Sequence, residues 1–284
     1  MKYFKFVKIE HTLFSLPVVF AGTFLGLEGR PLSLREFFWI FLAVLGARSA
    51  GFGLNRILDA GLDARNPRTA DREIPSGKIS LSGAWAFTGI SALVFMVSAG
   101  RLSRTCFFLS FIPLLFFAVY PMLKRRTVLC HLGLGLAWGI APLGGWFAVH
   151  PQILPLSRHL PAFLLAGFCI FWVAGFDIIY SLLDETFDRD NGIYSLPSVL
   201  GAFDALRVAR IFHFLSLMFL GTLVRVYLHY PLSFGFLCLA GLLLALSHWR
   251  VANEPLSAPV IDFAFFKMNA ALAFVVFLMI WIKR

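Results

Sequence analysis

Long apolar runs separated by polar connections make up most of this sequence. A helix that crosses a lipid bilayer needs roughly 20 largely apolar residues, and nine runs come close to that length. They cover about residues 12–29, 36–58, 80–99, 105–122, 128–149, 161–184, 207–228, 231–249 and 263–282. The pattern predicts an all-α polytopic membrane protein with nine transmembrane helices around a central cavity.

Two of the connections, residues 59–79 and 185–206, are longer than the others. Each directly follows an apolar run that ends in acidic residues. Because these runs are the second and the sixth of the series, a path that alternates across the membrane brings both acidic ends to the same side. The order of the runs therefore permits the two acidic ends to converge.

Oxygen-bearing side chains recur at helical spacing in both acidic ends. The first set, Asn55, Asp59 and Asp63, recurs every four residues, which places it on one helix face in steps of about 6 Å. The second set comprises Asp177, Tyr180, Asp184 and Asp188. Solvated charges at helix ends are the plain alternative. Two such sets on one side of a membrane favour a binding role, because charges there are costly.

A divalent cation would account for these carboxylates. Mg²⁺ prefers oxygen ligands and is usually held by one or two carboxylates together with substrate phosphates. Two pairs that face one another, Asp59 with Asp63 and Asp184 with Asp188, would bracket a diphosphate. Asn55 can add a neutral oxygen or hold a metal-bound water. We therefore predict a Mg²⁺ site formed by these five residues.

Composition supports the membrane assignment and narrows the partners. The chain is 59% apolar and 14% charged and contains 33 Phe residues, whereas a soluble domain is about one quarter charged. Its net charge of +10 could suit nucleic acid. In this apolar background, membrane orientation and a polyanionic substrate explain the charge better. We therefore expect a lipid bilayer as a partner and no nucleic acid.

The distribution of Lys and Arg predicts the orientation. The side that carries the N-terminus and both long connections has about twice as many basic residues as the other side, and basic residues are enriched in cytoplasmic loops. The N-terminus and the acidic ends should therefore be cytoplasmic. No separate soluble domain is evident in residues 1–284, although the two acidic sets suggest two pseudo-halves, about 1–127 and 128–284.

Basic residues on the same side are suited to a diphosphate. Arg68 and Arg72 follow the first acidic set in a connection stiffened by proline, and Lys124 and Arg125 follow the fourth apolar run. Guanidinium and ammonium groups bind phosphate oxygens through charge-assisted hydrogen bonds. The alternative is that some of these charges only orient the chain in the membrane.

Other polar residues lie at or inside the apolar runs. Arg48 lies within the second run, where a charge usually points into a cavity, so it is a candidate for binding an acidic group such as a substrate carboxylate. An ion pair with an internal acid is the alternative. His11 is a candidate for the mouth of the same cavity, whereas His213 and Asn269 are better explained by hydrogen bonds between helices.

These motifs together resemble the UbiA superfamily of intramembrane aromatic prenyltransferases. The first family motif is matched by Asn55, Asp59 and Asp63, the loop after it by the segment 66–77, and the second motif by Asp177, Tyr180, Asp184 and Asp188. Residues 8–17 look like the branch of 4-hydroxybenzoate and menaquinone-pathway polyprenyltransferases. The Leu182-Leu183 pair before Asp184 departs from the more polar family pattern.

The resemblance implies Mg²⁺-dependent transfer of a polyprenyl group from its diphosphate to the ring of a small aromatic acid. The acceptor would be 4-hydroxybenzoate, or else a dihydroxynaphthoate, in quinone biosynthesis at the bacterial inner membrane. Asp177 joins the four metal-binding aspartates as a catalytic candidate, and Tyr180 is a substrate-binding one. Asp177 and Asp184 both remain open as acceptors of the ring proton. Candidate aromatic linings of the cavity are Phe52, Trp138 and Trp172.

Two other classes compete with this interpretation. A transporter of an organic anion would use Arg48 and the basic connections as binding groups, but transporters place their ion sites near the bilayer midplane. An alcohol phosphatidyltransferase also uses Asp residues and a metal in the membrane. Its acids, however, lie in one compact motif, whereas the two sets here are more than 100 residues apart.

Overall fold

The computed structural model describes residues 2–8 and 12–283, and every regular element within them is helical. Eight helical segments of this described part are long and apolar enough to cross a membrane. They are α3 (Leu34–Asp63), α4 (Leu81–Leu102), α5 (Arg104–Leu109) with α6 (Phe111–Leu123), α7 (Cys130–Val149), α8 (Leu160–Ser181) with α9 (Glu185–Asp190), α10 (Leu196–Tyr227), α11 (Pro231–Asn253), and α12 (Ala258–Asp262) with α13 (Met268–Ile282). Together with the shorter apolar helix α2 (Thr12–Gly26), they confirm an all-α polytopic membrane protein.

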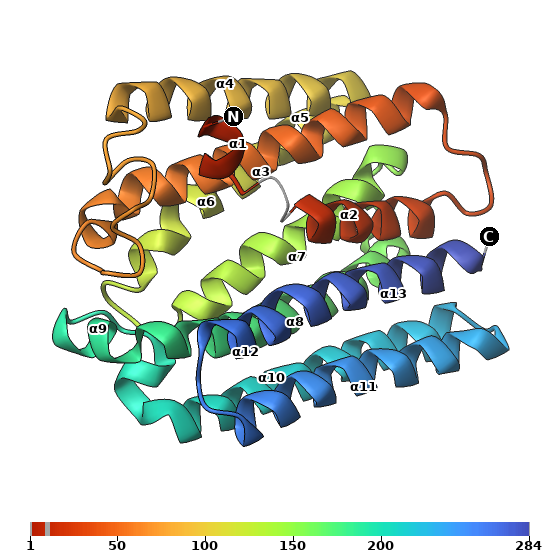
Figure 1. Ribbon diagram of the computed structural model, residues 1–284. Coiled ribbons are helices and arrows are strands. Elements are labelled where there is room, and N and C mark those ends of the chain that lie inside the picture. Colours follow the sequence, from red (N-terminus) through yellow and green to blue (C-terminus); the bar gives the residue numbers. More distant parts are fainter. Residues whose placement is uncertain (1, 9–11, 284) are drawn as a thin grey trace.

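The long helices lie side by side and run roughly along one direction (Figure 1). Helix α3 packs on α4, α7 packs on both α2 and α8, and α8 packs on α10. The connection after α3 and the short helix α9 lie at the same end of the bundle, at the left in Figure 1, and the C-terminus lies at the other end. The acidic ends of the second and sixth apolar runs thus share one end, as the alternation of the runs predicts.

Glycine allows unusually close contact between α2 and α7. A Cβ atom added to Gly22 would lie 2.0 Å from the carbonyl oxygen of Pro142, and one added to Gly145 would lie 2.0 Å from that of Val19. Both distances are far shorter than any van der Waals contact, so a side chain at either position would push the helices apart. Small residues have this packing role in many membrane proteins. Gly22 and Gly145 therefore serve the close packing of α2 on α7.

The polar residues inside the bundle link neighbouring helices. Nδ1 of His213 in α10 lies 2.8 Å from Nε2 of His248 in α11. Asn269 lies in α13, directly after the short π-helical segment Phe263–Lys267. It accepts a hydrogen bond of 2.7 Å from Nε1 of Trp172 and donates one of 2.6 Å to the carbonyl oxygen of Phe265. Since a π-helical turn leaves backbone carbonyls without their usual partners, Asn269 stabilises the turn and joins it to α8, as the helix–helix interpretation predicts.

We expect replacement of Asn269 by alanine to lower the free energy of unfolding by about 1–3 kcal/mol, because the buried Trp172 N–H would lose its partner. The measurement is detergent or denaturant unfolding of the purified protein, followed by far-UV circular dichroism. Asn253→Ala is the matched control, since Asn253 is exposed and its side chain only caps its own helix at the carbonyl of Trp249. Equal effects of the two substitutions would contradict the linking role of Asn269.

The connection predicted for residues 185–206 is wrong in detail. It contains α9 and the first turns of α10, which begins at Leu196 after Ser195 accepts a hydrogen bond from the Ser198 amide. Helix α10 is kinked at Gly201, where φ is 78°. The early turns look unlike a membrane span because they carry Asp204 and Arg207. These side chains are exposed and form an ion pair of 2.9 Å on the outer surface, so they do not interrupt the helix. The other long connection, predicted for residues 59–79, is closer to the structure, since α3 ends at Asp63.

Candidate active site

A cavity of about 550 Å³ lies among α2, α3, α6, α7 and α8 and is open to the connection after α3. Of the described residues predicted to form a site, all but Arg125 line it: Arg48, Asn55, Asp59, Asp63, Arg68, Arg72, Lys124, Asp177, Tyr180, Asp184 and Asp188. His11 lies outside the described residues. The two acidic sets, far apart in the sequence, therefore share one cavity.

The first acidic set lies on one face of the last turns of α3. Asn55 donates a hydrogen bond of 3.2 Å to Oδ2 of Asp59, and the same oxygen accepts a hydrogen bond of 2.6 Å from Nζ of Lys124. One turn further, Arg72 donates to Oδ1 of Asp63 at 2.7 Å. The side chains of both aspartates are almost completely buried, and each has a cationic partner that offsets the cost of burying the charge.

Each of these two aspartates also keeps one unused oxygen. Oδ1 of Asp59 and Oδ2 of Asp63 are buried and have no hydrogen-bond partner in the described part of the chain. Such oxygens are rare in folded proteins and call for an explanation. They are the hard ligands that Mg²⁺ prefers. Among the described residues no three His, Cys, Asp or Glu side chains form a ready-made cluster, so the fit is to an ion held by few carboxylates and by ligand oxygens.

The second acidic set is tied to the connection after α3. Asp184 accepts hydrogen bonds from Nδ2 of Asn66 at 2.8 Å and from Nε of Arg68 at 2.9 Å, and Nη2 of Arg68 donates to its other oxygen. Arg68 also donates to the Tyr180 hydroxyl at 2.8 Å. This bidentate pair fixes the connection against the end of α8, more than 100 residues away in the sequence.

Arg68 remains a cation in this setting. Burial by itself lowers the pKa of its guanidinium, but the hydrogen bonds with Asp184 and the nearby Tyr180 and Asp184 groups more than compensate and raise the pKa above its ordinary value. A permanent charge at this position is what binding of a phosphate oxygen requires.

The second acidic set does not lie on one regular helix. Helix α8 ends at Ser181, and a single 3₁₀ turn, Leu182–Asp184, leads into α9, which carries Asp188. Leu182, the first residue of this 3₁₀ turn, packs into the core. Asp177 and Asp188 still line the same cavity.

The basic pair after α6 divides between two environments. Lys124 reaches Asp59 inside the cavity. Arg125 instead donates a hydrogen bond of 2.6 Å to the carbonyl oxygen of Leu58 and lines a small groove outside the cavity. Its guanidinium is 3.9 Å from Asp59 and half-exposed. Arg125 thus contacts the end of α3 from the rim of the cavity, and its role in substrate binding remains a prediction.

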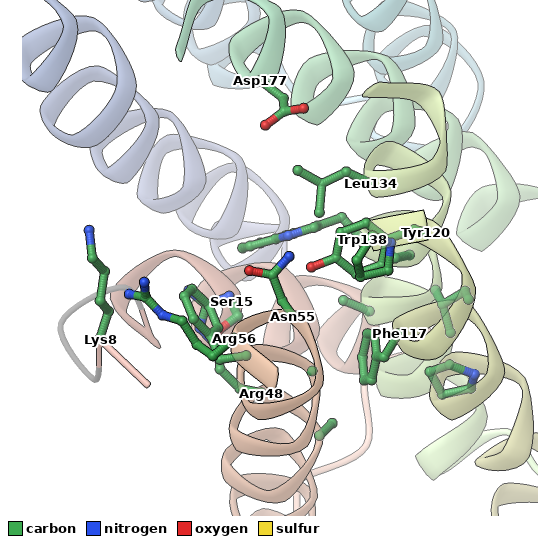
Figure 2. A pocket seen from close by; sticks show the side chains of 18 of the residues that line it. Lys8, Ser15, Arg48, Asn55, Arg56, Phe117, Tyr120, Leu134, Trp138 and Asp177 are labelled. Carbon is green, nitrogen blue, oxygen red and sulfur yellow. The ribbon is translucent and has the colours of Figure 1, made fainter. Parts of the chain in front are cut away.

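Deeper in the cavity, Arg48 lies against aromatic rings. Its guanidinium carbon is 4.5 Å from the centre of the Phe52 ring and 5.3 Å from that of Trp138. Figure 2 shows Arg48 and Asn55 on one helix, with Trp138 and Tyr120 beside them. Phe52 and Trp138 are therefore lining residues, as predicted. Trp172 of α8 is not a lining residue, because its side chain is fully buried and donates a hydrogen bond to Asn269 of α13.

Arg56 and His131 also line the cavity, although neither was predicted to belong to the site. Arg56 is 5% exposed, and its Nε and Nη1 atoms have no hydrogen-bond partner among the described residues. The reasoning that singled out Arg48, a charge inside an apolar run, would also have found it. His131 in α7 contacts Asp177 at 2.7 Å. Nothing in the sequence distinguishes it from His213, which links helices.

The fold and the cavity together define a class of protein: an integral membrane protein with a cavity whose acidic and basic residues lie at one end of the bundle and whose aromatic lining lies behind them. The sequence pattern of the UbiA prenyltransferase family matches residues 15–280. The chain belongs to this family.

Relatives with assigned functions are moderately similar. The chain is 33% identical to a 4-hydroxybenzoate octaprenyltransferase of Photobacterium profundum over 184 residues, which is 64% of this chain and 62% of that protein. A protein of the same description from Vibrio atlanticus is 32% identical over 194 residues, 68% of this chain and 64% of that one. The matches thus span slightly less than two thirds of the length of these relatives.

Solved structures resemble the whole chain. The apo structure of a UbiA homolog from Aeropyrum pernix is 31% identical, with a TM-score of 0.86 over 96% of this chain and 98% of that one. A UbiA homolog from Archaeoglobus fulgidus bound to GPP and Mg²⁺ has a TM-score of 0.72 at 18% identity, over 99% and 100% of the two chains. The second likeness concerns the fold alone.

Proposed function

We propose that this protein transfers a polyprenyl group from polyprenyl diphosphate to the ring of a small aromatic acid, with Mg²⁺ as cofactor. The observation that carries this proposal is the junction of the two acidic sets. Arg68 and Asp184 join the connection after α3 to the end of α8, so that carboxylates from both halves of the chain and cations from the first half surround one cavity. That arrangement suits a diphosphate bound together with divalent cations.

The head group of the donor would bind at the end of the cavity that holds the acidic sets. Asp59 and Asp63, which have unused oxygens, would hold Mg²⁺ together with Asn55, Asp184 and Asp188. When bound, Mg²⁺ would neutralise the charge that builds up on the diphosphate as its bond to the prenyl carbon breaks. Arg68, Arg72 and Lys124 supply cationic donors to the phosphate oxygens.

The aromatic part of the cavity suits the other product of that bond cleavage. Loss of diphosphate leaves an allylic cation, which water would capture. Phe52 and Trp138 present ring faces to the cavity, and such faces attract cations. The surrounding apolar helices keep water away from the reacting carbon. The ring of the acceptor can then attack in place of water.

Among acceptors, 4-hydroxybenzoate is favoured over a dihydroxynaphthoate, because the relatives described above act on the former. Arg48 would bind the acceptor carboxylate. Its charge lies within the membrane-spanning part of α3 and faces the cavity, and the rings of Phe52 and Trp138 orient its guanidinium. We place the protein in a bacterial inner membrane with the acidic end of the bundle facing the cytoplasm.

Purified protein in lipid nanodiscs, supplied with Mg²⁺, a polyprenyl diphosphate and a panel of aromatic acids, tests this function. We expect diphosphate release and a prenylated aromatic acid, identified by mass spectrometry, with 4-hydroxybenzoate as the best acceptor. Preference for a dihydroxynaphthoate would correct the acceptor alone. Uptake of an organic anion into proteoliposomes, without any diphosphate release, would replace the enzyme by a transporter.

Replacing Arg48 by glutamine should raise KM for the aromatic acid by about 10- to 100-fold, because a hydrogen-bonded charge pair contributes about 1.5–3 kcal/mol. KM for the prenyl donor should change little. Arg101→Gln is the matched control, since Arg101 also stacks on an aromatic ring, Trp39 at 5.6 Å, but outside the cavity. An increase of the donor KM alone would assign Arg48 to the diphosphate.

A further inference from the structure

His131 and Asp177 form a hydrogen-bonded pair in the wall of the cavity. Nδ1 of His131, in α7, lies 2.7 Å from Oδ2 of Asp177, in α8. The His131 side chain is 3% exposed and that of Asp177 is 24% exposed, so the carboxylate is the member of the pair that a ligand can reach. In Figure 2 the Asp177 carboxylate lies across the cavity from Asn55.

The second ring nitrogen of His131 determines which tautomer is present. Nε2 lies 3.1 Å from the backbone nitrogen of Leu196, which can only donate a hydrogen bond. Leu196 is the first residue of α10, where backbone N–H groups lack partners within the helix. Nε2 must therefore accept, and the ring proton of a neutral imidazole resides on Nδ1. A doubly protonated ring would direct an N–H group at the Leu196 N–H group.

Nδ1 of His131 consequently donates its hydrogen bond to Asp177. This sets Asp177 apart from Asp59, Asp63 and Asp184, each of which is ion-paired with Lys or Arg. Lys124 and Arg72 occupy an oxygen of Asp59 and of Asp63 at 2.6 Å and 2.7 Å. Asp177 has no such Lys or Arg partner among the described residues, and His131 holds its carboxylate in one orientation.

We propose that His131 is a positioning residue that orients Asp177 as the base that removes the ring proton of the acceptor, a role that rests on the proposed prenyl transfer. The bond between the prenyl carbon and the diphosphate oxygen breaks, and its electron pair leaves with the diphosphate. A π pair of the ring forms the new carbon–carbon bond. The proton on that ring carbon then passes to Asp177, its bonding pair restores aromaticity, and the proton leaves for water when the product departs.

The test uses an acceptor deuterated at the ring positions that are attacked. In wild-type enzyme the isotope effect on kcat should be close to unity, because proton removal follows the harder bond cleavage. His131→Gln can still accept from the Leu196 N–H but loses the donor toward Asp177. We expect it to lower kcat by about 10- to 100-fold and to raise the isotope effect clearly above unity, with KM for the donor unchanged.

Two further variants separate positioning from folding. His131→Asn places an amide N–H near the position of Nδ1 and should restore most of kcat and a low isotope effect. Asp177→Glu keeps a base but moves it by one methylene, so it should again lower kcat and raise the isotope effect. His159→Gln is the control, because His159 is also a buried histidine with a hydrogen bond at each ring nitrogen, but it lies outside the cavity. It should leave the isotope effect unchanged.

An isotope effect that stays at the wild-type value in both His131→Gln and Asp177→Glu would overturn the inference and leave His131 with a structural role. If His131→Gln does not fold, Asp177→Glu and His131→Asn decide the matter by the same measurement. Failure of the wild-type protein to prenylate any aromatic acid would instead reject the proposed function.

Discussion

Replacement of Asp63 by asparagine should lower kcat/KM for diphosphate release by about 10³-fold, because one group that stabilises developing charge contributes about 10²–10³ and Mg²⁺ adds to this. The substitution keeps the shape of the side chain while it removes the charge. Oδ2 of Asp63 is buried and has no hydrogen-bond partner in the described ranges, so a metal ion is the missing partner that this prediction assumes.

The measurement is steady-state release of diphosphate at saturating acceptor, before and after chelation of divalent cations. Chelation should abolish wild-type activity, and added Mg²⁺ should restore it. Asp204→Asn is the matched control, because Asp204 forms an exposed ion pair with Arg207 on the outside of α10. Asp63→Asn activity within 10-fold of wild type, or wild-type activity that survives chelation, would contradict a metal role for Asp63.

Replacement of Arg68 by lysine should lower kcat/KM by about 10²-fold although the charge is retained. Arginine donates in a planar fork to both oxygens of Asp184 and to the Tyr180 hydroxyl, and a lysine ammonium cannot reproduce that geometry. Hydrogen bonds to charged groups contribute about 1.5–3 kcal/mol, which accounts for the size of the effect. The connection after α3 should also lose its attachment to α8.

Hydrogen exchange of the backbone amides in residues 64–76 measures this attachment, and exchange should become faster in Arg68→Lys. Arg65→Lys is the control, since Arg65 is exposed in the same connection and lines only the outer groove. The double variant Arg68→Lys with Asp184→Asn should be no worse than the more damaging single variant, because the two residues act as one unit. Fully additive losses would show that they work independently.

Much of this architecture could be predicted because membrane helices depend on simple physics. Apolar runs must be helical in lipid, and their alternation across the membrane places Asp63 and Asp184 at one end of the bundle. The spacing of Asn55, Asp59 and Asp63 also led directly to one face of α3. What these predictions share is their dependence on local composition and on the order of the runs.

The sequence is less informative where a neighbouring element decides the outcome. Arg125 and Lys124 are adjacent and chemically alike, yet the carbonyl of Leu58 holds one outside the cavity and Asp59 draws the other in. The start of α10 was missed because an exposed ion pair looks polar in a sequence. His131 acquires its partner from α8 and its tautomer from α10, neither of which its own segment reveals.

The pairing of acids with bases in the cavity has a consequence for how an ionic ligand can enter a membrane. The described lining residues include six Lys or Arg and five Asp side chains, so the pocket is close to electroneutral before any ligand arrives. A diphosphate that arrives with its divalent counter-ions brings little net charge. Exchange of ionic partners within the pocket then avoids the large self-energy of an isolated charge in a low-dielectric interior.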